Sequence, residues 1–133
     1  MNLKTAKSIL VSINVIALVY HALIVTRVVD FVNVWGGQLQ TVVQMYTFET
    51  ISIAIQMLLL WFILSFKIEK GVGNRFYIYL FFSLALLMLL NTIGNVFAKT
   101  DFERFIFAPL TLVASYCYFV YYSALRTTRN QMK

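Results

Sequence analysis

Two ionisable side chains stand within otherwise apolar stretches of this sequence. His21 lies in the run SILVSINVIALVYHALIVT, and Glu49 lies in the run MYTFETISIAIQMLLLWFILSF. An imidazole and a carboxylate can bond to one another, bind a polar ligand or exchange a proton near neutral pH. Because a charge is costly in lipid, ionisable groups in spanning helices face the bundle interior and are functional candidates by default. We therefore take His21 and Glu49 as the centre of a candidate site.

Amide side chains lie at a similar depth in the other apolar stretches. Counted from the middle of each stretch at a rise of about 1.5 Å per residue, His21 lies about 6 Å, Glu49 about 10 Å, Asn91 about 6 Å and Asn95 about 12 Å toward the same membrane surface. Helical spacing also places Glu49 and Gln56 on one face of their helix. We expect these polar groups to converge on one layer in the outer half of the membrane.

This layer predicts a polar ligand pocket that opens toward the outside. Its expected lining is His21, Glu49, Gln56, Asn91, Asn95 and Trp35, and its expected floor is Leu84, Leu87, Ile55 and Trp61. Trp35 precedes Gly36 and Gly37, which allow a tight backbone turn. Its ring therefore either anchors the chain among the lipid headgroups or folds over the pocket as a lid.

Three interpretations of the His21 and Glu49 pair follow from their chemistry. The two side chains can satisfy one another and fix the packing of their helices, they can bind a ligand, or they can act as acid and base. Their estimated depths differ by about 4 Å, which allows a direct hydrogen bond. We assign no catalytic residue and prefer a role that is not enzymatic.

Four apolar stretches are long enough to span a bilayer, which takes about 20 residues of helix. They predict helices over residues 8–27, 45–66, 76–98 and 105–125, with 28–44 as an interfacial connection that is too polar and glycine-rich to cross. The expected fold is an all-α integral membrane four-helix bundle of up-down-up-down topology, with residues 1–133 as a single transmembrane domain. The short loops predict that the last three helices are antiparallel neighbours.

Basic residues are concentrated on one side of the predicted bundle. The two termini and the loop between the second and third helices hold eight lysines and arginines and one acid, Glu69, whereas the charges of the opposite side balance. Lysine and arginine mark the cytoplasmic side of short loops. We therefore expect both termini in the cytoplasm of a multi-pass plasma (inner) membrane protein.

The composition excludes several other classes of protein. Apolar residues make up 61% of the chain and charged residues 12%, so a water-soluble domain has too little polar surface. Cys117 and His21 are single residues of their types, which excludes a disulfide scaffold and a four-ligand zinc site. We predict no metal and no cofactor. The basic residues form no stripe with interleaved aromatic residues, so nucleic acid is not an expected partner.

The leading hypothesis is a small membrane protein that binds a small, partly apolar ligand in the predicted pocket. Transport of that ligand is an extension of the hypothesis and favours a homo-oligomer, because four short helices leave little room for a complete path. The second hypothesis is a non-catalytic partner or assembly protein whose polar layer only fixes helix register. The third is a membrane enzyme that acts on a lipid-like substrate, with Glu49 and His21 as acid and base.

Overall fold

A computed structural model describes residues 1–131 of the chain, and every regular element in that range is helical. Four helices are long and apolar enough to cross a membrane. They are α1 (Leu3–Val25), α2 (Val42–Ser65), α4 (Arg75–Val96) and α5 (Ala108–Gln131), the last preceded without a break by the π-helical turn η3 (Glu103–Phe107). The expected all-helical fold with four helices of membrane-spanning length is confirmed.

The helices start where side chains cap them. The Asn2 side chain accepts a hydrogen bond from the Thr5 amide at 2.8 Å and starts α1 at Leu3 rather than at residue 8. Thr41 and Gln44 form a reciprocal capping box that starts α2 at Val42 rather than at residue 45. Since lysine and arginine are good helix formers, α1 continues through Lys4 and α5 runs past residue 125 to Gln131. The charges therefore limit the apolar stretch rather than the helix.

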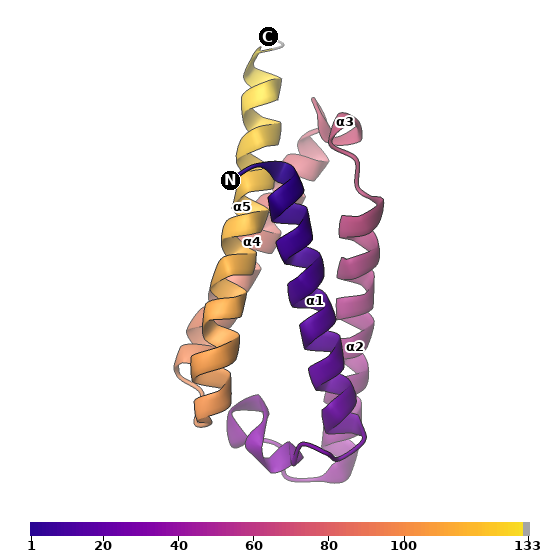
Figure 1. The fold of residues 1–133 in the computed structure, drawn as a ribbon, viewed down its shortest axis with the longest axis vertical. Coiled ribbons are helices and arrows are strands. Elements are labelled where there is room, and N and C mark those ends of the chain that lie inside the picture. The colour runs from indigo at the N-terminus through magenta and orange to yellow at the C-terminus, as the bar shows by residue number, and fades with distance from the viewer. Residues whose placement is uncertain (132–133) are drawn as a thin grey trace.

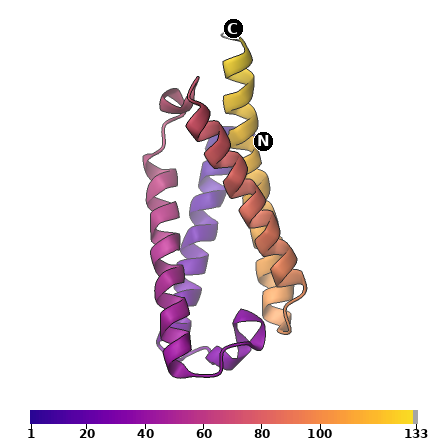
Figure 2. The same cartoon turned by 180° about the vertical axis from the view of Figure 1, so that it is seen from behind.

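The helices pack as two pairs. In the first pair α1 packs on α2, in the second α4 packs on α5, and α1 joins the pairs by packing on α5. Extensive contact between α2 and α4 is missing, although only the short helix α3 (Ile68–Gly71) and its flanking loops separate them. The expectation that the last three long helices are packed neighbours is confirmed for α4 and α5, whereas α2 and α4 meet only at the terminal end, where the Phe62 and Phe81 ring centroids lie 5.5 Å apart. Figures 1 and 2 show the two pairs diverging away from the end that holds both termini.

Aromatic side chains join the two pairs at the terminal end. The Phe81 ring of α4 stacks on the Tyr121 ring of α5 with centroids 4.8 Å apart, and the Phe66 ring packs edge-on against Phe81 at 4.9 Å. Phe66 follows the last residue of α2, so this cluster connects three helices. The main hydrophobic core therefore lies at this end, and other contacts stabilise the opposite half of the bundle.

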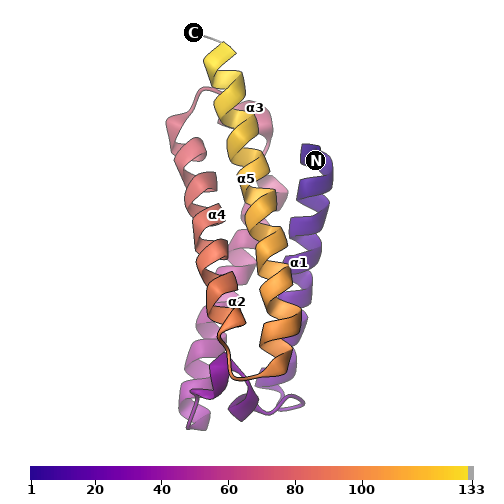
Figure 3. The same ribbon diagram turned by 90° about the vertical axis from the view of Figure 1, so that its left-hand side faces the viewer.

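The connection between α1 and α2 lies at the end opposite the termini (Figures 1 and 3). It contains two short turns, η1 (Phe31–Asn33) and η2 (Trp35–Gly37). A small apolar cluster of Ile24, Val34, Leu39 and Met45 fixes it against the ends of α1 and α2. Its backbone has positive φ at Trp35, Gly36 and Gly37, with values of 55°, 65° and 72°. This reversal directs the connection back toward the bundle.

Candidate ligand cavity between the helix pairs

Glu49 is fully buried and joins three elements through its carboxylate. Its Oε2 lies 2.5 Å from Nδ1 of His21 on α1, and its Oε1 accepts a hydrogen bond from the Trp35 indole at 2.8 Å. Glu49 itself comes from the face of α2 that also buries Met45. Each carboxylate oxygen thus has a partner, as a buried ionisable group requires.

The η2 turn places Trp35 beside this pair. Its left-handed backbone is uncommon for a residue with a bulky side chain. The ring lies against Phe48, with centroids 5.1 Å apart, while its indole N–H reaches Glu49. Trp35 therefore connects the turn to α2 by packing and by a hydrogen bond.

A cavity of about 500 Å³ lies between the two helix pairs. This volume is within the range of small-molecule sites. Most of the lining is apolar and comes from all four long helices. The polar and aromatic residues among the lining side chains are Asn14, Tyr20, His21, Trp35, Ser52, Gln56, Asn91, Asn95, Glu103, Phe107, Thr111 and Tyr118.

The structure brings five of the six predicted site residues to this cavity. His21, Trp35, Gln56, Asn91 and Asn95 all line it. Glu49 does not line it, because its side chain is completely buried behind its contacts with His21 and Trp35. The sequence places Glu49 at the right depth, but depth alone does not tell whether a side chain faces a cavity or the next helix.

The expected floor of the pocket is partly wrong. Trp61 is 66% exposed on the outer surface of α2, and Leu84 is buried in the aromatic cluster at the terminal end. Ile55 and Leu87 do line the cavity. Trp61 faces outward because it lies five positions after Gln56, about 140° further around α2 from the face that lines the cavity.

The cavity opens sideways between α2 and α4. Three of its lining residues on these helices are half-exposed or more: Ile55 at 51%, Leu87 at 52% and Leu90 at 65%. Val34 and Trp35 line the end of the cavity formed by the connection. The predicted opening toward the outside is thus covered by chain, and the open side is one that lipid tails would meet.

Two buried polar groups in the cavity wall lie beside each other. They are the Asn14 amide on α1 and the Tyr118 hydroxyl on α5, whose side chains are 4% and 1% exposed and lie within reach of one another, although no well-aligned bond joins Asn14 Oδ1 to the hydroxyl. The Asn14 amide nitrogen donates to the Leu10 carbonyl, so only its oxygen is left. The two groups therefore satisfy one another, or bond to a ligand or water in the cavity.

Glu103 is a site residue that the sequence analysis missed. It is 8% exposed, lines the cavity, and accepts hydrogen bonds at Oε2 from the Gly36 amide at 2.9 Å and the Thr100 hydroxyl at 2.7 Å. In the sequence, Glu103 is one of the acidic residues that balance the basic residues in the loops opposite the termini. Its position at the start of an apolar helix, three residues after a threonine, was the available signal.

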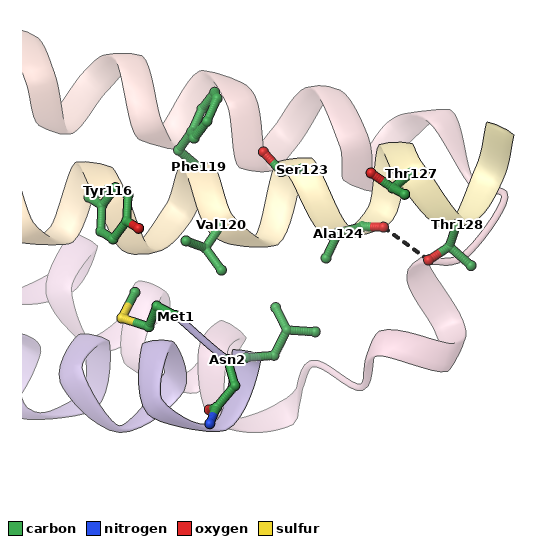
Figure 4. Close-up of a pocket in the computed structure, with 10 residues that line it drawn as sticks. Met1, Asn2, Tyr116, Phe119, Val120, Ser123, Ala124, Thr127 and Thr128 are labelled. Atoms are coloured by element: carbon green, nitrogen blue, oxygen red, sulfur yellow. Dashed lines mark hydrogen bonds between the residues drawn. The ribbon is translucent and has the colours of Figure 1, made fainter. Parts of the chain in front are cut away.

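A second hollow, of about 540 Å³, lies at the terminal end of the molecule (Figure 4). It is formed by Met1, Asn2 and Leu3 against one face of α5, where the Thr128 hydroxyl bonds to the Ala124 carbonyl at 3.0 Å. None of the predicted site residues lines it. Its walls carry no charged side chain in the described part of the chain, so it offers no comparable chemistry.

Among residues 1–131, no group of histidine, cysteine, aspartate and glutamate side chains is suited to hold a metal ion. The arrangement can therefore offer hydrogen bonds, a carboxylate and aromatic faces to a ligand. In comparisons with known proteins, no family model, no curated protein and no solved structure matches this chain.

Proposed function

We propose that this protein binds a small, partly apolar ligand in the cavity between its helix pairs. The single observation that carries the proposal is the cavity itself, whose mostly apolar wall carries polar side chains from all four long helices. A packed structural core would leave no such space. A ligand with an apolar body and hydrogen-bonding groups would match this lining.

The ligand reaches the cavity from the membrane interior. The half-exposed residues Ile55, Leu87 and Leu90 border the gap between α2 and α4, so an apolar molecule dissolved in lipid can enter there. His21, Gln56, Asn91 and Asn95 then provide the hydrogen bonds. Glu49 contributes indirectly, because it orients the side chains of His21 and Trp35 and does not itself contact the ligand.

The proposal includes an orientation in the membrane. The bundle has up-down-up-down topology within a plasma (inner) membrane, and both termini face the cytoplasm, because the basic residues gather at the terminal end. The end of the cavity lined by Trp35 and Glu103 then lies toward the outside. Transport would add a conformational step to binding, and a homo-oligomer would provide the second half of a path.

A cavity-filling substitution tests the proposal. Ala17 lines the cavity on α1, whereas Val19 is 55% exposed on another face of the same helix. With Trp61→Phe, Trp35 remains as the only tryptophan and reports on the cavity through its fluorescence. We expect octanol to change this fluorescence saturably in the parent and in Val19→Phe, and at least tenfold more weakly in Ala17→Phe. Equal affinity in both variants would contradict the proposal.

One observation favours a second candidate function, that of a non-catalytic partner protein in a membrane assembly. The carboxylate oxygens of Glu49 are both used within the chain, and Glu103 fastens the connection to the start of η3. Such bonds suit a purely structural role. Under this alternative the Ala17→Phe variant would retain every function, since the cavity would have none.

A further inference from the structure

We infer that the cavity selects ligands whose polar end is an organic cation, such as an amine or quaternary ammonium with an apolar tail. The inference rests on the proposed function and names the ligand class for the same site. Three independent features of the described residues carry it: the charges of the lining, the geometry of Glu103, and the aromatic rings around that carboxylate.

The lining contains acidic but no basic charge that could hold an anion. No lysine or arginine lines the cavity within residues 1–131. His21 is bonded to Glu49, so with the Glu49 carboxyl ionised the two together carry a net charge of zero or minus one. An anionic headgroup would therefore enter a site with no compensating cation, which is a costly arrangement.

Glu103 has an oxygen available for such a ligand. Both of its hydrogen bonds go to Oε2, which leaves Oε1 without a donor among the described residues. The ion pairs among the described residues are His21 with Glu49 and Arg104 with Asp101, so no lysine or arginine forms an ion pair with Glu103. A buried carboxylate is stabilised when a cation approaches its free oxygen.

Aromatic rings surround the same end of the cavity. Tyr20, Trp35 and Phe107 line it, and the Tyr20 ring lies 4.7 Å from the Phe107 ring between centroids. Aromatic faces near a carboxylate are a favourable environment for ammonium groups, because the ring quadrupole attracts cations.

The dimensions indicate how large such a ligand is. Asn14 and His21 are seven positions apart on α1, which corresponds to about 10 Å along the helix. An alkyl tail of about eight carbons spans that distance from the cationic end toward Asn14 and Tyr118. Ile13, Ala17, Leu59 and Leu87 provide the apolar walls between.

Three probes with the same tail test the inference: octyltrimethylammonium, octanol and octanesulfonate. Each is titrated into the Trp61→Phe protein in lipid nanodiscs, with Trp35 fluorescence as the readout and empty nanodiscs as the partition blank. We expect the cation to bind at least tenfold more tightly than the alcohol and the sulfonate to show no saturable binding. This comparison needs no variant in the site.

Two charge-removing variants test whether the Glu103 carboxylate is responsible for the preference for a cation. Glu103→Gln should reduce the affinity for the cation about tenfold more than that for octanol, so that the preference between the two probes is lost, and an unchanged circular-dichroism spectrum reports that the fold persists. Asp101→Asn, whose side chain is 83% exposed in the same loop, should retain the parent preference. Equal binding of the three probes, or a cation preference that survives Glu103→Gln, would overturn the inference while leaving the proposed function standing. Absence of saturable binding by any probe would contradict both.

Discussion

At the residue scale, Glu49 combines a charge-bearing group with complete burial in an apolar helix. The bilayer offers no water to it, so its stability depends on His21 and on the Trp35 indole. The sequence alone identifies His21 and Glu49 as a pair, because both interrupt apolar runs at similar depth. It does not reveal that Glu49 faces its partners rather than the cavity, nor that Glu103 does line it, since rotation of a side chain about its helix depends on packing.

The Glu49→Ala substitution should destabilise the protein strongly. It removes a fully buried side chain and both acceptors at once, which leaves the Trp35 indole and His21 without this partner, at a cost of about 3 kcal/mol. Thermal unfolding in detergent, followed by circular dichroism, measures the loss. Glu69→Ala, at an exposed position in α3, is the control and should unfold like the parent. Equal midpoints for the two variants would show that the buried bonds contribute nothing.

At the element scale, the helices follow from the sequence better than their arrangement does. Apolar runs and caps predict four long helices, and the differences at the ends arise because charged residues such as Lys4 and Arg126 continue a helix beyond the membrane. The divergence of α2 from α4 could not be predicted, because it depends on the large rings of Phe66, Phe81 and Tyr121 packing at one end only. The inward fold of the 28–44 connection likewise depends on the tertiary bonds of Trp35 and Gly36.

The η2 turn should respond to the loss of a glycine in a way that a helical glycine does not. An added Cβ at Gly36 meets only Gln38 at 3.8 Å, so the cost of Gly36→Ala comes from its φ of 65° and amounts to about 1–2 kcal/mol. Gly94→Ala, in the interior of α4 with open space around it, should instead stabilise by about 1 kcal/mol. Chemical denaturation of both variants in the same detergent checks the opposite signs. The same sign in both would refute the left-handed turn.

At the scale of the whole molecule, the charges and the cavity define two different ends. The terminal end carries the aromatic core and the excess of basic residues, of which Lys133 lies outside the described residues. The opposite end carries Glu49, Glu103 and the connection that covers the cavity. This polarity is the reason for proposing a fixed orientation in the membrane and a ligand that enters from its outer half.

Reporter fusions check the proposed orientation. A fluorescent protein that matures only in the cytoplasm should be bright when fused after Lys133 and dark when inserted after Gln40 in the connection. Alkaline phosphatase, which is active only outside the cytoplasm, should give the reverse pattern at the two positions. A phosphatase that is active after Lys133 and inactive after Gln40 would invert the orientation and move the end of the cavity lined by Glu103 to the cytoplasmic side.

The most direct measurement of the central claim is an electron-density map of the protein crystallised from a lipidic phase with no ligand added. We expect elongated density in the cavity, with a polar atom within hydrogen-bond distance of Asn14 Oδ1 or the Tyr118 hydroxyl and one end near Glu103. Helices α2 and α4 packed against one another, with side chains filling the space between the pairs and no such density, would contradict it.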